Sequence, residues 1–274
     1  MTSYVTFEVQ DTNGVDSRLI FPGLLPATPV DYRIDDGVRT ELTYAINGQI
    51  YGLHCDGTTF SLAPYSRDVQ GVATGMSLVR VNEDRSETDL MDVTMALDPL
   101  LVTKYGGLPV NSLLGLTPDG LINLVRNDSD FELTFLGNTG NDRLYGSDYV
   151  DFLNGRAGRD RLTGYGGSDT FYFDAFGKAD RDNIADFHHL TDKIAIDGNV
   201  LAGIRPGNLA RTFHDISEDG MAAEDANDRL LYDRHAGLLY YDGDGNAAHG
   251  AKAQVVAVFD NHAHLDTQDL QIFL

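Results

Sequence analysis

The stretch that decides the fold is residues 137–172, which divide into four nine-residue units without a gap. The units read Gly137-Asn-Thr-Gly-Asn-Asp-Arg-Leu-Tyr, Gly146-Ser-Asp-Tyr-Val-Asp-Phe-Leu-Asn, Gly155-Arg-Ala-Gly-Arg-Asp-Arg-Leu-Thr and Gly164-Tyr-Gly-Gly-Ser-Asp-Thr-Phe-Tyr. Glycine opens every unit, aspartate holds the sixth place, and leucine or phenylalanine holds the eighth. A fixed period of this kind indicates a stacked repeat architecture in which each unit contacts its neighbours.

Each place in the unit has a physical role. The first six residues are expected to form a tight turn, because glycine in the first and fourth places adopts backbone angles that are costly for other residues. The last three residues are expected to form a short strand whose eighth side chain points to the interior. Stacked units would then bury a ladder of Leu144, Leu153, Leu162 and Phe171. The pattern predicts a parallel β-roll.

The turns concentrate oxygen atoms. Successive turns would fall on opposite edges of the roll, so that Asp142 lies near Asp160 and Asp151 lies near Asp169. Calcium prefers six to eight oxygen ligands and accepts mixtures of carboxylates and carbonyls. The candidate metal ligands are the four aspartates and residues in the first, third and fourth turn places: Asp142, Asp151, Asp160, Asp169, Gly137, Thr139, Gly140, Gly146, Asp148, Gly155, Ala157, Gly158, Gly164, Gly166 and Gly167.

Four units would hold about two calcium ions, or three if flanking residues contribute. The second unit departs from the pattern, because Tyr149 stands where the other units have the fourth-place glycine. A strained turn at Tyr149 would weaken the site that uses it. In addition, no unit has glycine in its second place.

The composition narrows the class of protein. The chain has 274 residues, 42 Asp plus Glu against 20 Lys plus Arg, and a net charge of −22. This charge argues against a nucleic-acid partner, whose phosphates attract basic surfaces. No stretch approaches the roughly 18 apolar residues of a transmembrane helix, and the N-terminus lacks a secretory leader pattern. The single cysteine, Cys55, excludes an intrachain disulfide.

Residues 1–130 read as a separate, mostly β module, and residues 131–274 as the repeat domain. Asn47-Gly48 separates two alternating apolar segments and predicts a hairpin, with Asp56-Gly57 as the next turn. Residues 86–101 fit both a helical face and a strand, and we expect a short helix that ends before Pro99. Overall the sequence predicts a mainly all-β chain.

The repeats resemble the calcium-binding units of RTX (repeats-in-toxin), or haemolysin-type, proteins. Residues 182–196, the segments that begin at Arg229, Gly237 and Ala253, and the ending after Asp269 are similar to the C-terminal part of serralysin-type RTX exoproteins. The resemblance implies a secreted, extracellular bacterial protein with a β-hairpin-rich C-terminal cap, exported uncleaved by a type I apparatus and folded by calcium. It covers about residues 131–274 and does not extend to residues 1–130.

The role of residues 1–130 stays open between two classes. The chain has no His-Glu-x-x-His zinc motif, no Gly-x-Ser-x-Gly elbow and no Walker phosphate loop. These absences favour a binding module for an extracellular glycan or cell-surface ligand. The alternative is an extracellular enzyme, such as a polysaccharide-modifying one, with dispersed catalytic carboxylates. The histidines of His188-His189 and His262-Ala-His264 lack an acidic or cysteine partner at metal-site spacing, so we expect them to be merely exposed.

Overall fold

The computed structural model describes residues 3–9, 31–35, 39–46, 49–62, 69–85, 87–96, 131–201, 203–216, 227–243 and 253–273. The chain divides into two compact units, Met1–Leu136 and Gly137–Leu274. Each is described by itself below. Whether residues 1–130 and 131–274 fold independently stays a prediction.

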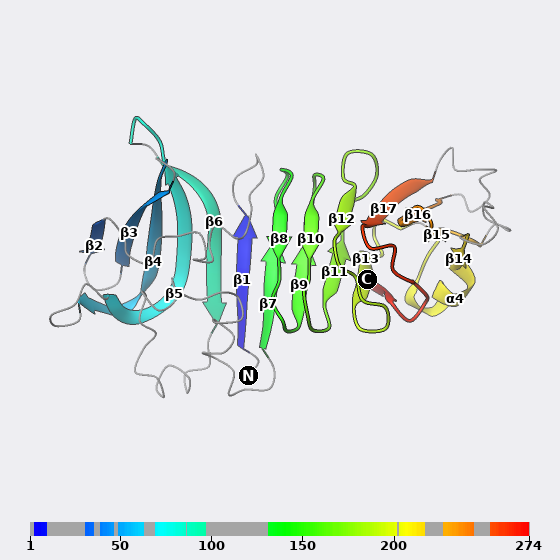
Figure 1. The fold of residues 1–274 in the computed structure, drawn as a ribbon. Helices are drawn as coiled ribbons and strands as arrows, with labels where there is room; N and C mark the ends of the chain where they lie inside the picture. The colour runs from blue at the N-terminus through cyan, green and yellow to red at the C-terminus, as the bar shows by residue number, and fades with distance from the viewer. Residues whose placement is uncertain are drawn as a thin grey trace. The chain divides into compact units, whose positions relative to one another are not determined.

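The first unit contains one sheet with the strand order β7-β1-β6-β5-β4-β3-β2 (Figure 1). Neighbouring strands in this sheet pair antiparallel, except for β1 and β7, which pair parallel. The strands are β1 (Ser3–Val9), β2 (Asp31–Asp35), β3 (Arg39–Ile46), β4 (Gln49–Leu62), β5 (Val69–Val81), β6 (Glu87–Ala96) and β7 (Phe131–Leu136).

The predicted hairpin between β3 and β4 is confirmed, since the two strands pair antiparallel from Ile46 opposite Gln49 onward. The predicted turn at Asp56-Gly57 is wrong, because β4 continues through it and only shifts register there against β5. A β-bulge absorbs an extra residue without ending the strand, and a glycine suits it.

The helix predicted within residues 86–101 is also wrong. Residues Glu87–Ala96 form β6, which pairs with β1 on one side and β5 on the other. Hydrogen bonding on both edges satisfies the backbone of an extended chain, and the β-branched residues of this segment favour that conformation. Pro99, before which the predicted helix was to end, lies outside the described residues.

The second unit is built on two sheets of short parallel strands (Figure 1). One has the order β9-β11-β13-β18 and the other β8-β10-β12-β17. Successive strands of the repeat therefore alternate between the sheets, as a β-roll requires. The strands are β8 (Arg143–Tyr145), β9 (Asp151–Asn154), β10 (Arg161–Thr163), β11 (Thr170–Phe173), β12 (Asp182–Ile184), β13 (Lys193–Asp197), β17 (Gln254–Phe259) and β18 (Leu270–Phe273).

The predicted interior ladder is confirmed. Leu144, Leu153, Leu162 and Phe171 are at most 1% exposed. The strand register places Leu162 opposite both Leu144 and Ile184, and Phe171 opposite both Leu153 and Ile194. Burying a side chain of this size stabilises the fold by about 1.5–3 kcal/mol. The apolar stack thus fixes the register that positions the turns.

A C-terminal cap continues the second sheet through hairpins. Strand β16 (Leu238–Tyr241) pairs antiparallel with β17, and β15 (Leu230–Asp233) pairs antiparallel with β16. Strand β14 (Phe213–Asp215) lies at the edge of the sheet, next to β15. The described helical segments are short: a 3-10 turn η2 (Pro206–Asn208) and α4 (Leu209–Thr212). The mainly β class is therefore confirmed, as are the hairpins that the resemblance implied.

Candidate calcium-binding turns

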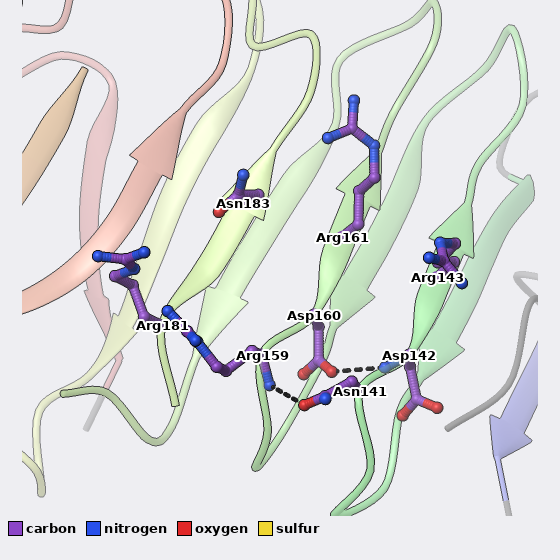
Figure 2. Close-up of a pocket in the computed structure, with 8 residues that line it drawn as sticks. All are labelled: Asn141, Asp142, Arg143, Arg159, Asp160, Arg161, Arg181 and Asn183. Carbon is purple, nitrogen blue, oxygen red and sulfur yellow. Dashed lines mark hydrogen bonds between the residues drawn. The ribbon is translucent and has the colours of Figure 1, made fainter. Parts of the chain in front are cut away.

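The first row of turns joins the odd units of the repeat along one edge of the roll. The backbone N–H of Asp142 donates to Asp160 Oδ1 at 2.8 Å, and Figure 2 shows the two side chains on neighbouring turns. The N–H of Asp160 in turn donates to Asp182 Oδ1 at 2.9 Å. Each carboxylate thus lies over the backbone of the preceding turn, and the row is continuous across three turns.

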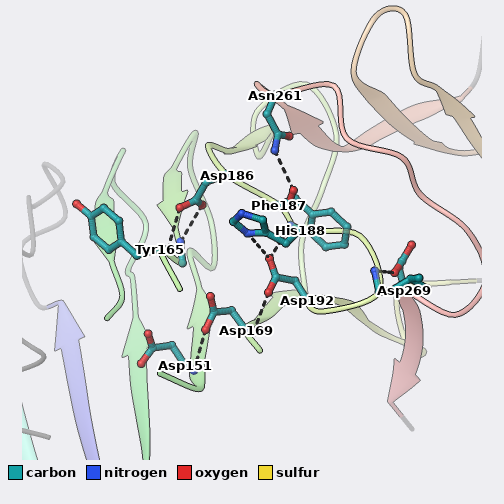
Figure 3. Close-up of polar contacts among 11 residues, drawn as sticks. Asp151, Tyr165, Asp169, Asp186, Phe187, His188, Asp192, Asn261 and Asp269 are labelled. Atoms are coloured by element: carbon teal, nitrogen blue, oxygen red, sulfur yellow. Dashed lines mark hydrogen bonds and ion pairs between the residues drawn. The ribbon is translucent and has the colours of Figure 1, made fainter. Parts of the chain in front are cut away.

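The second row repeats this geometry on the other edge (Figure 3). The N–H of Asp151 donates to Asp169 Oδ1, and the N–H of Asp169 donates to Asp192 Oδ1, both at 3.1 Å. Asp192 Oδ2 also accepts the backbone N–H of His188 at 2.7 Å. The structure therefore brings together the two predicted pairs of aspartates and extends each pair by one residue.

Asp182 and Asp192 are the residues that the nine-residue period missed. The two repeat spacings within the rows are 18 residues, but the last contacts span 22 and 23 residues. Insertions after the fourth unit break the phase. The signal that remains is Asp-x-Ile, because Asp182-Asn-Ile184 and Asp192-Lys-Ile194 reproduce the sixth and eighth places of a unit.

All six row aspartates are buried, with side chains no more than 2% exposed. Such burial is rare for a carboxylate, and here each carboxylate lies next to others of the same charge. Asp160 Oδ2 is moreover buried without a hydrogen-bond partner. An orphaned carboxylate oxygen inside a stack of like charges is the chemistry of a cation site rather than of a plain turn.

Burial also raises the pKa values of four of these carboxyls, those of Asp160, Asp169, Asp182 and Asp192. Desolvation, reinforced by the charge of Asp142, raises the pKa of Asp160 to about 7. Desolvation and the charge of Asp151 raise the pKa of Asp169 to about 9. Desolvation and the charge of Asp160 raise the pKa of Asp182 to about 9, and burial raises the pKa of Asp192. Without a cation, the rows oppose their own ionisation.

Carbonyl oxygens converge on the same turns. A Cβ placed on Gly146 would lie 2.5 Å from Asp151 Oδ2 and 2.7 Å from the Gly164 carbonyl oxygen. Gly158, at φ +132°, would clash with the Gly140 carbonyl oxygen. Only glycine fits where carboxylate and carbonyl oxygens from alternate units meet. These donors are all oxygen, as a hard cation requires.

The remaining predicted ligands lie on the same turns with different exposure. Gly137, Gly140, Gly155 and Gly164 are buried, Ala157 and Gly166 are half-buried, and Thr139, Asp148 and Gly167 are exposed. Two further aspartates close the turns from beyond the repeats. Asp186 accepts the N–H groups of Gly164 and Tyr165, and Asp180 accepts the N–H of Gly158.

The strain predicted at Tyr149 is wrong, because Tyr149 is not among the described residues with positive φ. Strain falls instead on the second place of the third and fourth units, where Arg156 has φ 62° and Tyr165 has φ 69°. A non-glycine residue in this left-handed region costs about 1 kcal/mol or more. The missing second-place glycines, rather than Tyr149, are therefore the costly departures from the pattern.

A cavity of about 340 Å³ opens beside the first row (Figure 2). Its lining includes Asp142 and Asp160 together with four arginines: Arg143, Arg159, Arg161 and Arg181. Arg161 forms an ion pair with Asp260, and Arg161 lies opposite Arg143 in the strand register. The arginines offset part of the negative charge on this edge of the roll.

Comparison with known proteins agrees with this geometry. Residues 136–171 match the RTX calcium-binding nonapeptide repeat in four copies. A search of curated proteins found no match to the chain. Within the described residues, no helix has the length and apolar character needed to cross a membrane. The stacked turns, the buried ladder and this match together identify the chain as a mainly β protein that carries four RTX calcium-binding nonapeptide repeats.

Proposed function

We propose that the chain is an exported bacterial RTX protein in which calcium ions bridge the stacked turns and order residues 131–274. The observation that carries the proposal is the pair of continuous rows of buried aspartates, each with three members. Burial and mutual repulsion raise the pKa values of four of these carboxyls and so favour their neutral form. A divalent cation among them stabilises the charged form instead. Folding and calcium binding are therefore coupled.

The rows suggest where the ions lie. The predicted positions are between Asp142 and Asp160 and between Asp151 and Asp169. Asp182 and Asp192 continue the rows with the same hydrogen-bond pattern. They therefore add one ion position between Asp160 and Asp182 and one between Asp169 and Asp192. We therefore propose two ions between the repeats and one more at the end of each row, where the sequence alone suggested two or three ions.

Calcium titration followed by circular dichroism and calorimetry tests the proposal. Calcium should increase the strand signal and the melting temperature of the full chain, whereas magnesium at the same concentration should not, because it keeps its water shell. Asp182→Asn should reduce the number of bound ions. Asp215→Asn, an exposed carboxylate at the end of β14, serves as the control. Identical titrations for both variants would refute the proposed end position.

Export through a type I apparatus follows from the same coupling. The C-terminal strand β18 pairs with β13, and Leu270 and Ile272 are buried there. A C-terminal export signal in this segment would be readable only before the roll folds. Scarce cytosolic calcium would keep the chain open inside the cell, and extracellular calcium would then fold it.

Deletion of residues 215–274 should abolish release of the chain into the medium of cells that carry a type I exporter. The full chain in cells without the exporter provides the matched control. Undiminished secretion of the truncated chain, or an N-terminally processed product in the medium, would contradict this route.

For residues 1–130 we propose a binding role toward an extracellular glycan or cell-surface ligand, with an extracellular enzyme as the alternative. The missing catalytic motifs support the binding role. Binding of the calcium-loaded chain to immobilised polysaccharides without their turnover is the expected result. Release of shortened or modified sugar products would favour the enzyme.

A further inference from the structure

Two histidines and an aspartate outside the calcium rows come together near the C-terminus. His189 lies in the loop between β12 and β13, and His264 and Asp266 lie between β17 and β18. One ligand atom from each of the three residues lies within 4.8 Å of the others. The acidic partner that the sequence spacing did not reveal is therefore present in the fold.

The imidazole of His189 is held by a buried carboxylate. His189 Nδ1 lies 2.7 Å from Asp269 Oδ2, and the side chain of Asp269 is fully buried. The same carboxylate accepts the N–H groups of Leu190 at 2.8 Å and Asp266 at 2.9 Å. A proton on Nδ1 donated to Asp269 leaves the lone pair of His189 on Nε2. A carboxylate that orients a histidine in this way is the usual outer partner of a metal-ligating imidazole.

The second histidine is within reach of the first. His264 Nδ1 lies 3.5 Å from His189 Nδ1, and the two ring centroids are 4.3 Å apart. Two imidazoles this close to one another can ligate the same metal ion. His264 is exposed and Asp266 is half-buried, so the cluster is open to solvent.

We propose that His189, His264 and Asp266 form a zinc-binding site, with Asp269 as the positioning residue for His189. Two imidazoles and one carboxylate suit zinc and are unsuited to calcium, which prefers oxygen ligands. Tetrahedral zinc ligands at about 2.0–2.1 Å from the metal lie roughly 3.3 Å apart. Because His264 is exposed, we expect its side chain to turn toward Nε2 of His189, the ligand atom that the Asp269 contact leaves available, and water to complete the coordination.

The position of the site gives it a structural consequence. Zinc would join the loop after β12 to the segment that leads into β18, which is the last strand paired with β13. It would thus fasten the C-terminal strand to the roll independently of the calcium rows. None of its three ligands belongs to a row. The site rests on the proposed function only in that calcium orders the domain, so zinc binding is measured in saturating calcium.

Zinc titration of the full chain in saturating calcium tests the proposal by calorimetry. The unmodified chain should bind one zinc ion, and its melting temperature should rise. His264→Ala and Asp266→Asn should each weaken zinc binding at least about tenfold, which is the lower bound seen for loss of an outer partner alone. His235→Ala, an exposed histidine in the turn between β15 and β16, is the matched control and should bind zinc as the unmodified chain does.

Cobalt provides a second readout, because tetrahedral Co²⁺ has a visible absorption that the octahedral aqueous ion lacks. This absorption should appear with the unmodified chain and be lost in His264→Ala. Circular dichroism in calcium verifies that the variants fold, as expected for an exposed side chain and for an Asn that keeps the oxygen accepting the Gln268 N–H. The proposal is overturned if zinc does not bind, if His264→Ala binds zinc unchanged, or if His235→Ala loses it.

Discussion

Replacement of Asp160 by asparagine should change stability in opposite directions with and without calcium. Asp160 is the middle member of the first row, and its Oδ1 accepts the N–H of Asp142 while its own N–H donates to Asp182. Asparagine retains a side-chain oxygen that can accept the Asp142 N–H. It also leaves unchanged the backbone N–H that donates to Asp182. The substitution therefore removes a buried charge and changes little else in the geometry.

The magnitude follows from the pKa of Asp160, which burial raises from 3.8 to about 7. At 1.36 kcal/mol per unit, a charged Asp160 destabilises the calcium-free fold by roughly 4 kcal/mol above neutral pH. The buried amide of asparagine needs a new partner at a cost of about 1–3 kcal/mol. We therefore expect Asp160→Asn to stabilise the calcium-free fold by about 2 kcal/mol.

In calcium the sign should reverse. An ion bound at a hundredfold excess over its dissociation constant stabilises the fold by about 2.7 kcal/mol. Asp160 faces two proposed ion positions, so its loss should remove up to about 5 kcal/mol of stabilisation. The variant should thus be markedly less stable than the unmodified chain in saturating calcium.

Thermal melting followed by circular dichroism, in chelator and in saturating calcium, measures both effects. Asp215→Asn controls for the loss of one negative charge at an exposed position. A melting transition in chelator that appears or rises in Asp160→Asn, and falls in calcium, is the expected result. Destabilisation in both buffers would refute the reasoning, because it would show that the Asp160 charge stabilises the fold without an ion.

Two further predictions concern pH and backbone strain. The pKa values of Asp160, Asp169 and Asp182 are raised to about 7, 9 and 9, so the calcium-free fold should be most stable below about pH 4 and lose stability as pH rises through these values. Calcium affinity should rise over the same interval with release of protons, and melting curves in chelator that do not depend on pH would contradict this. Arg156→Gly should stabilise the roll by about 0.5–1 kcal/mol, because Arg156 has φ 62° and glycine relieves the left-handed strain at some entropic cost. Urea denaturation in calcium measures it, and a less stable variant would show that the Arg156 side chain contributes more than its backbone costs.

The repeat domain could be predicted from sequence because one period specifies both its turns and its interior. Leu162 and Phe171 stand in the eighth place, and the structure buries both. The rows were predicted only as far as the period held. Asp182 and Asp192 belong to them through backbone pairing of β12 and β13, which insertions hide from a strict nine-residue count.

Other features depended on contacts that no local pattern contains. The segment Glu87–Ala96 alternates like a strand and also presents a helical face, and pairing with β1 and β5 decided between them. His189 and Asp269 are 80 residues apart and meet because β18 returns to β13. Spacing along the chain therefore gave no reason to group these residues.

Hydrogen exchange at the backbone amides of Asp142, Asp151, Asp160 and Asp169 tests the central claim most directly. Each of these N–H groups donates to the next carboxylate of its row, so its protection reports whether the row is assembled. Calcium should slow exchange at all four amides in the full chain, and chelator or magnesium should leave them fast. Equal protection in calcium and in chelator would contradict the claim that calcium holds the rows together.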